Sequence, residues 1–251
     1  MCRAAPRPSV EGMNTQPPIA VVTGASRGLG LALADALAAA GYRLVIDARD
    51  SVALETAAAS LASRHGWRVT ALAGDIADPA HRAALAVAAA ELGGAGLLIN
   101  NAGTLGASPL PAIADYPPAE LLDAFDRNVV APVALTQLLL PGLRQAGGAV
   151  LCVTSDAAIE AYAGWGGYGA AKAALEQACN VLAAEESAVR VWWVDPGDLR
   201  TRMHQQAFPG EDISDRPLPE SVAPAFLHLI SQRLPSGRYR AADLRPAGVT
   251  A

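Results

Sequence analysis

Lys172 is the only lysine in this chain, and it stands four residues after Tyr168. An ammonium group is a compact charge with three movable donors, whereas a guanidinium group is a planar fork, so a lone lysine among many arginines indicates a task that arginine cannot perform. The spacing places both side chains on one face of a helix. From this spacing alone, an acid–base pair and an ordinary tyrosine stacked on a lysine stem both stay open.

A second group of residues with chemical potential is a glycine-rich turn, which reads Thr-Gly-Ala-Ser-Arg-Gly-Leu-Gly over residues 23–30. It follows a short apolar run and precedes a helical pattern. Glycines let the backbone turn sharply and approach a pyrophosphate, while the start of the helix offers free N–H groups and a positive dipole end. The turn therefore favours a phosphate-binding site, although a tight strand-to-helix connection would need similar residues.

The same turn also contains the pattern Gly-x-Ser-x-Gly, which is typical of the nucleophile elbow of α/β-hydrolases and would make Ser26 a nucleophile. Only one strand and a short extension precede Ser26, so the usual preceding strands and oxyanion loop are missing. No histidine ends a late strand, because His204 lies in an irregular stretch and His228 within a predicted helix. The sequence therefore argues against the hydrolase alternative.

These residues are set within an alternation of strands and helices. Apolar runs predict strands over 19–23, 43–47, 68–74, 96–99, 149–154 and 189–194, and a short last strand is expected over 238–241. Helices are predicted over 29–40, 51–63, from 79 onward, 119–145, 168–186 and 221–234, with Pro132 and Pro141 expected to kink or divide the fourth. We therefore predict an α/β fold: a single doubly wound Rossmann-type domain over 18–251, with a mostly parallel sheet of about seven strands and helices on both faces.

Composition limits the other function classes. The net charge of −5 and the lack of basic runs argue against a nucleic-acid partner. No apolar run is long enough for a membrane span. Three cysteines without CxxC spacing and four scattered histidines predict no metal site and favour a reducing cytoplasm. We expect residues 1–17 to be a disordered extension, and Met13 is a candidate start of translation.

Four motifs occur in order along the chain. The glycine turn follows the first predicted strand, Asn100–Gly103 the fourth and Ser155 the fifth, and Tyr168 and Lys172 come thirteen and seventeen residues after Ser155. A sixth strand ends at 195, before Pro196 and Gly197. Together the motifs resemble the short-chain dehydrogenase/reductase family over about residues 18–241. All of them follow the carboxyl ends of strands, where ligands bind in open α/β sheets.

The resemblance implies catalytic roles for Asn128, Ser155, Tyr168 and Lys172. Tyr168 would be the general acid that protonates a carbonyl oxygen as hydride arrives, or the base in the oxidative direction. Lys172 would lower the pKa of this phenol and hold the nicotinamide ribose. Ser155 would hold the substrate oxygen, and Asn128 a water in the proton path; alternatively, Asn128 caps or bends a helix.

The resemblance also implies a nucleotide site. Asp75 corresponds to an adenine-contacting aspartate, and residues 101–103 to a segment beside the adenine ribose. The expected cofactor-binding residues are Gly24, Ser26, Arg27, Gly28, Leu29, Gly30, Arg49, Asp75, Ile76, Asn101, Ala102, Gly103, Tyr168, Lys172, Pro196, Gly197, Leu199 and Thr201. One departure from the family pattern is the pair Trp192-Trp193 in the sixth strand, where smaller residues are common.

The end of the second strand bears on the choice of cofactor. An acidic side chain there favours NAD, whereas arginine favours the 2′-phosphate of NADP. By resemblance, the discriminating position is 48, an alanine, followed by Arg49, and Arg27 lies in the glycine turn. We therefore expect NADP (NADPH), with NAD as the alternative if a register shift by one brings Asp47 to that position.

The expected reaction is hydride transfer between NADP(H) and a small-molecule carbonyl or alcohol, in the direction of ketone or aldehyde reduction. Two alternatives are an NAD-dependent alcohol dehydrogenase of the same family and a dinucleotide-binding sensor without turnover. The resemblance implies a homodimer or homotetramer. The substrate is not readable from the sequence, although residues 198–219 have the length and prolines of a lid, and Tyr162, Trp165, Met203 and Phe208 are candidate pocket residues.

Overall fold

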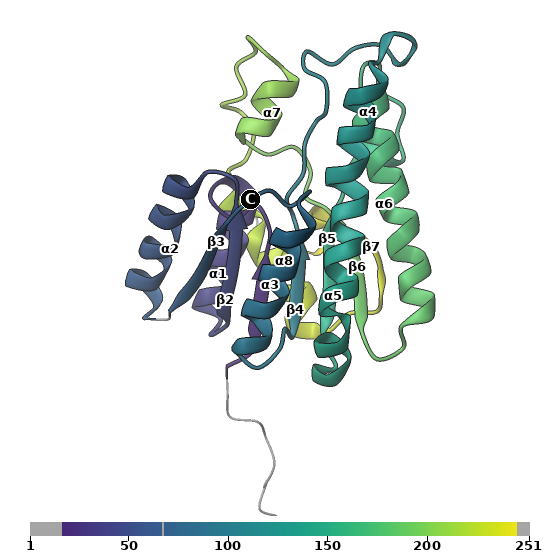
Figure 1. Cartoon of the computed structure of the whole chain (residues 1–251). Helices are drawn as coiled ribbons and strands as arrows, with labels where there is room; N and C mark the ends of the chain where they lie inside the picture. Colours follow the sequence, from purple (N-terminus) through teal and green to yellow (C-terminus); the bar gives the residue numbers. More distant parts are fainter. Residues whose placement is uncertain (1–16, 67, 245–251) are drawn as a thin grey trace, which may run out of the picture.

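The computed structural model describes residues 17–66 and 68–244, so the extension predicted over residues 1–17 lies almost entirely outside the described residues. All seven strands form one parallel sheet in the order β3-β2-β1-β4-β5-β6-β7 (Figure 1). Their bounds are β1 Ile19–Val22, β2 Arg43–Ala48, β3 Val69–Ala73, β4 Leu97–Asn100, β5 Ala149–Val153, β6 Arg190–Asp195 and β7 Gly237–Arg240.

Within residues 17–66 and 68–244, eight α-helices connect and cover these strands: α1 Gly28–Ala39, α2 Ser51–His65, α3 Pro79–Glu91, α4 Pro118–Phe125, α5 Ala131–Ala146, α6 Gly166–Glu185, α7 Arg202–Ala207 and α8 Ala223–Gln232. The side chains of α1, α2 and α8 share one hydrophobic cluster with one face of the sheet. Those of α3, α5 and α6 share a second cluster with the other face. The predicted doubly wound α/β fold is confirmed.

The central strands are apolar along most of their length because both of their faces are covered. In β1, Ala20 and Val22 belong to one cluster, and Ile19 and Val21 to the other. The tryptophan pair of β6 follows the same alternation. Trp192 is fully buried on the α1 side, where its indole N–H donates to the carbonyl oxygens of Leu234 and Pro235 at 3.0 and 3.1 Å, and Trp193 packs on the α6 side.

Local signals set most helix ends. Asp78 caps α3 by accepting from the N–H of Ala80 at 2.8 Å, as its sequence predicts, and Pro79 occupies the first turn. The single long helix predicted over 119–145 is divided, but not as expected. A π-helical turn over Asp126–Val130 joins α4 to α5, Pro132 lies in the first turn of α5, and Pro141 is accommodated inside α5.

The stretch 198–219, predicted to be irregular, contains the short helix α7. In Figure 1, α7 stands beyond the carboxyl ends of the strands. Thr201 caps it by accepting from the N–H of His204 at 3.1 Å. None of the helices in the described part of the chain is long and apolar enough to cross a membrane. Within residues 17–66 and 68–244, no group of three or more His, Cys, Asp or Glu side chains is arranged to hold a metal ion.

Candidate active site

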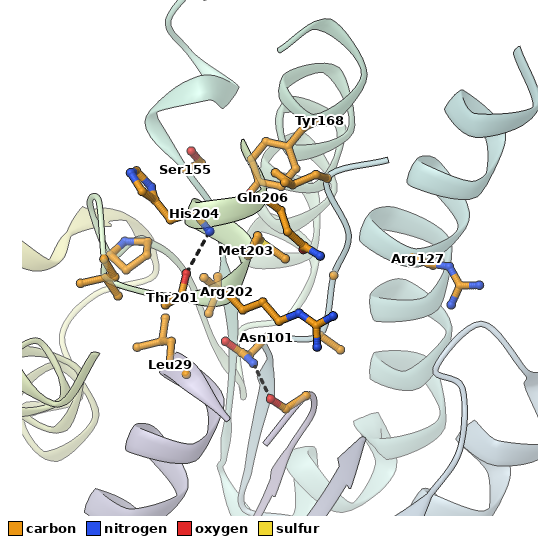
Figure 2. Close-up of a pocket in the computed structure, with 18 of the residues that line it drawn as sticks. Leu29, Asn101, Arg127, Ser155, Tyr168, Thr201, Arg202, Met203, His204 and Gln206 are labelled. Carbon is orange, nitrogen blue, oxygen red and sulfur yellow. Dashed lines mark hydrogen bonds between the residues drawn. The ribbon is translucent and has the colours of Figure 1, made fainter. Parts of the chain in front are cut away.

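A cavity of about 720 Å³ opens at the carboxyl ends of the strands (Figure 2). Its size lies in the range of small-molecule sites. The structure brings most of the predicted site residues to its wall: Gly24, Ser26, Arg27, Gly28, Leu29, Arg49, Asp75, Ile76, Asn101, Ala102, Gly103, Ser155, Tyr168, Lys172, Pro196, Gly197, Leu199 and Thr201. Gly30 and Asn128 lie behind this wall.

The glycine turn is built for close backbone approach. Gly24 and Gly28 have φ values of 68° and 57°, which favour glycine. A Cβ atom on Gly24 would also lie 3.0 Å from the Cα of Ala102. Gly30, although not on the cavity wall, has no room for a side chain because the carbonyl of Gly24 and the amide of Asn101 lie against it. The turn therefore combines a positive-φ backbone with a start of α1 that faces the cavity.

Thr23 and Asn101 join the first strand to the fourth. The Thr23 hydroxyl accepts from the N–H groups of Asn101 and Ala102, both at 3.0 Å. The Asn101 amide donates in return to the carbonyl oxygen of Thr23 at 2.8 Å. The Asn101 side chain therefore holds the glycine turn in place through hydrogen bonds to the backbone of the turn.

Asp47 is the residue on which the choice of cofactor depended. It is buried, with one carboxylate oxygen accepting from the N–H of Gly24 at 2.7 Å and the other 3.0 Å from Nε2 of His81. The carboxylate is therefore used to hold the glycine turn. β2 ends at Ala48, and the side of the cavity beyond it is lined by Ala48 and Arg49.

The two arginines expected beside a 2′-phosphate differ in their partners. Arg27 forms an exposed ion pair with Asp50 at 3.0 Å. None of the ion pairs in the described part of the chain involves Arg49, which is exposed at the cavity rim. A dianionic group bound beside Ala48 could therefore pair with Arg49 without displacing another partner, whereas Arg27 is already paired with the Asp50 carboxylate.

Asp75 follows β3, where its sequence position predicts an adenine contact. Its carboxylate lies 2.5 Å from Nη1 of Arg127 and accepts from the N–H of Ala77 at 3.0 Å. The hydrogen bond from Arg127 is the main reason that the pKa of Asp75 is below its usual value. Arg127 also contacts Asp123, and it lines the cavity although the sequence analysis did not single it out.

Ser155, Tyr168 and Lys172 meet at the inner end of the cavity. Ser155 follows β5 and caps the next turn, and Tyr168 lies in the first turn of α6. Lys172 lies one turn further along α6, with Nζ 5.5 Å from the Tyr168 ring centroid. Nζ donates to the carbonyl oxygen of Val153 at 2.8 Å, which ties the ammonium group to the end of β5. Both side chains are buried, so the Tyr168–Lys172 pair does not lie on the protein surface.

The pKa values at this point differ from the expectation that Lys172 lowers the pKa of Tyr168. Burial raises the pKa of Tyr168 above its usual value, with further contributions from the negative charges of Asp195 and Asp156. Burial lowers the pKa of Lys172 to about 8. The physical reason is desolvation, which disfavours the charged form of each group.

Asn128 lies in the π-helical turn between α4 and α5 and is fully buried. Its side-chain oxygen accepts from the N–H of Thr104 at 2.9 Å, and its amide donates to the Thr104 carbonyl oxygen at 2.8 Å. These two bonds fasten the π-helical turn to the loop after β4. The predicted alternative role in bending the helix therefore agrees with its contacts; the predicted water contact stays untested.

Several cavity residues were not found by sequence reasoning. Asp156 accepts from the hydroxyls of Ser155 at 2.9 Å and Tyr162 at 3.0 Å. His204, Arg202 and Gln206 project from α7, as Figure 2 shows for their labelled side chains. The only available signal for Asp156 was its place directly after a strand end. α7 carried no signal, because its position over the cavity depends on the path of residues 198–219.

The hydrolase alternative finds no support in the geometry. Ser26 lines the cavity, but none of the hydrogen bonds among the described residues joins it to a histidine. The side chains of His65 and His81 are instead bound to Asp35 and Asp47.

Comparison with known proteins agrees with this geometry. The sequence pattern of the short chain dehydrogenase family matches residues 18–212. The chain is 38% identical to sepiapterin reductase of Meriones unguiculatus over 204 residues, which cover 75% of this chain and 77% of that protein.

Two solved structures are similar in fold. A short chain dehydrogenase of Shigella flexneri complexed with NADP superimposes with a TM-score of 0.85 and 29% identity, covering 90% of this chain and 98% of that one. L-Sorbose reductase of Gluconobacter frateurii, complexed with NADPH and L-sorbose, superimposes with a TM-score of 0.78 and 30% identity, covering 90% and 94%. From its sequence pattern, its sheet and its cavity, this chain belongs to the short-chain dehydrogenase/reductase family of oxidoreductases.

Proposed function

We propose that this protein is an NADPH-dependent reductase of small ketones or aldehydes, with Tyr168 as the general acid. The observation that carries the proposal is the assembly of Ser155, Tyr168 and Lys172 at the inner end of a cavity whose other end is the glycine turn. A dinucleotide laid along this cavity would bring its reactive ring to these three side chains. The family relatives that are complexed with NADP or NADPH support the same arrangement.

The residues present fit the dinucleotide. Gly24 and Gly28 leave the space that a pyrophosphate needs, and α1 begins at Gly28 with its N–H groups free to bind it. Ala48 leaves room for a 2′-phosphate, and Arg49 offers it a positive charge. Because Asp47 already binds Gly24 and His81, its carboxylate is not free to take a ribose 2′-hydroxyl, which supports NADP over NAD.

When bound, the reduced nicotinamide supplies a hydride to the carbonyl carbon. Tyr168 would then give its phenolic proton to the carbonyl oxygen. A pKa raised by burial keeps this phenol protonated at neutral pH, as a proton donor for reduction requires. For the same reason, alcohol oxidation through the phenolate would need alkaline pH.

Ser155 would hold the carbonyl oxygen beside Tyr168. Its hydroxyl donates to Asp156, and its oxygen accepts from the N–H of Ala157 at 3.2 Å. To donate to a substrate oxygen, the hydroxyl hydrogen must rotate away from Asp156. Lys172 would bind the nicotinamide ribose through its remaining donors and return a proton toward Tyr168, while Asn128 holds the loop beside it.

The direct test is oxidation of NADPH in the presence of a panel of ketones and aldehydes, with the wild type and Tyr168→Phe. We expect turnover with the wild type and a loss of about 10³-fold in kcat for Tyr168→Phe, since general acid catalysis contributes 10²–10⁴-fold. Tyr239→Phe, which removes a distant exposed hydroxyl, is the matched control. NADPH binding without turnover of any carbonyl or alcohol would favour a dinucleotide-binding sensor.

The cofactor preference has its own test. We expect the wild type to bind NADPH more tightly than NADH, and Arg49→Ala to lose about 10-fold in NADPH affinity with little change for NADH, because one charge-assisted phosphate contact contributes about 1.5 kcal/mol. Dissociation constants from fluorescence titration measure both. Equal affinities in the wild type would contradict NADP specificity.

A cytoplasmic location and a homodimer or homotetramer also stay predictions, which fractionation and light scattering can test.

A further inference from the structure

The polar group least explained by the reaction is the imidazole of His204. Its side chain is only 10% exposed, it lines the cavity, and its Nε2 atom has no hydrogen-bond partner among the described residues. Buried polar atoms are normally paired, and leaving one unpaired costs about 1–3 kcal/mol. Because the His204 side chain lines the cavity, the lack of a partner for Nε2 among the described residues indicates a partner that arrives with the substrate.

The position of His204 is fixed from two sides. Its backbone N–H is bound to the Thr201 hydroxyl at 3.1 Å, and its ring lies against Phe208, with ring centroids 4.9 Å apart. Phe208 contacts Trp165 at 6.0 Å, and Trp165 contacts Tyr168 at 5.7 Å, edge to face. A continuous aromatic wall thus connects the imidazole to the general acid. In Figure 2, His204 lies on the same side of the pocket as Ser155 and Tyr168.

The charges near His204 define what kind of group it can bind. Nδ1 lies 3.8 Å from a carboxylate oxygen of Asp198, which favours the tautomer with hydrogen on Nδ1 and a free lone pair on Nε2. Asp156 and Asp195 line the same part of the cavity, so an anionic group is disfavoured there. An Nε2 lone pair accepts a hydrogen bond, so the group that it binds must be a donor, either neutral or positively charged.

We propose that His204 is a specificity-determining residue that accepts a hydrogen bond from a hydroxyl or amino group carried by the substrate beside its reacting carbonyl. The preferred substrates are therefore α-hydroxy or α-amino ketones with a planar apolar body, which Trp165 and Phe208 cover. This inference rests on the proposed reductase function and adds the class of substrate to it.

The test uses three ketones that differ at one position: acetophenone, 2-hydroxyacetophenone and 2-methoxyacetophenone. The methoxy compound keeps the oxygen but has no hydrogen to donate. We expect the wild type to prefer the hydroxy over the methoxy compound by about 10-fold or more in kcat/KM, since one hydrogen bond contributes about 0.5–1.5 kcal/mol. His204→Leu should bring this ratio close to one, and His204→Gln, which keeps an acceptor, should restore part of it.

Controls separate this role from packing and from cofactor binding. His228→Leu removes a histidine of α8 that does not line the cavity, and it should leave the ratio unchanged. The NADPH dissociation constant should be the same in His204→Leu as in the wild type; a weaker one would assign Nε2 to the cofactor and overturn the proposal. An unchanged hydroxy-to-methoxy ratio in His204→Leu would overturn it as well.

Failure of the reductase function would look different, because no ketone of the panel would be turned over at saturating NADPH. In that case, calorimetry with the NADP-loaded protein still measures binding of 2-hydroxyacetophenone. Binding that is at least several-fold weaker in His204→Leu would support the recognition role without turnover. Equal binding by the two proteins would contradict it.

Discussion

Around β1 and β2, buried polar side chains are paired with one another, whereas around β5, β6 and α6 they are buried with incomplete partners. Asp47 uses both carboxylate oxygens to hold Gly24 and His81. At the other end of the cavity, burial shifts the pKa values of Tyr168 and Lys172 away from their usual ranges, and Nε2 of His204 has no hydrogen-bond partner within the described part of the chain. The paired groups of the first region stabilise the fold. The groups of the second region are buried in forms that reduce the stability of the free protein, and they are relieved only when they bind a ligand or react.

Lys172→Met should have the largest effects, and it should change stability and activity in opposite directions. We expect the free energy of unfolding of the cofactor-free protein to rise by about 2–3 kcal/mol at neutral pH, because the variant no longer buries an ammonium group, and we expect reductase activity to be lost. Chemical denaturation and NADPH oxidation measure the two effects. A stability equal to or below that of the wild type would contradict the view that Lys172 is retained at a cost.

The pH dependence of this difference has a definite sign. The pKa of Lys172 is lowered from 10.5 to about 8 in the folded protein. Between these values the unfolded chain holds more protons than the folded one, so the wild type gains stability from this group as the pH rises through the interval. The advantage of Lys172→Met is therefore full below pH 8 and should shrink toward pH 10.5.

Asp47→Ala tests the region with paired groups. We expect a loss of about 2 kcal/mol in the free energy of unfolding, since the buried N–H of Gly24 and the ring of His81 both lose a partner. Thermal denaturation measures this, with the half-exposed carboxylate of Asp35 replaced in Asp35→Ala as a control. A stability within a few tenths of a kcal/mol of the wild type would show that the turn is held without Asp47.

Asp156→Asn should produce the smallest effect. The charge of Asp156 helps to raise the pKa of Tyr168, so its removal should lower that pKa and move the alkaline rise of alcohol oxidation to lower pH, by about one unit or less. The pH profile of kcat/KM with NADP⁺ and an alcohol measures the shift. Asp115→Asn, at an exposed carboxylate outside the cavity, should leave the profile in place; a shift toward higher pH in Asp156→Asn would contradict the electrostatic reading.

Much of the fold followed from local patterns. All seven predicted strands agree with the structure to within about two residues at each end. The first six follow from apolar runs, because a strand covered on both faces needs apolar side chains at most positions. The path after residue 118 was less predictable. The helix pattern continues through Asn128, and only the contact of Asn128 with Thr104 shows why the chain forms a π-helical turn there.

The sequence by itself determined that Ser155, Tyr168 and Lys172 meet at one edge of a parallel sheet, because the carboxyl ends of parallel strands share that edge. It also supplied glycines where the backbone must adopt positive φ. Only the tertiary structure decided that the Asp47 carboxylate is not free to bind a cofactor. It is turned inward to Gly24 and His81, which leaves Ala48 and Arg49 on this side of the cavity.

The tertiary structure likewise decided the protonation of the site. Sequence spacing predicted that Lys172 would lower the pKa of Tyr168, but burial depends on packing from many distant residues and has the larger effect. The same holds for His204, whose chemistry comes from the fold of residues 198–219 over the cavity. Spacing along a chain fixes which groups can meet, whereas desolvation and missing partners arise only when the whole domain closes around them.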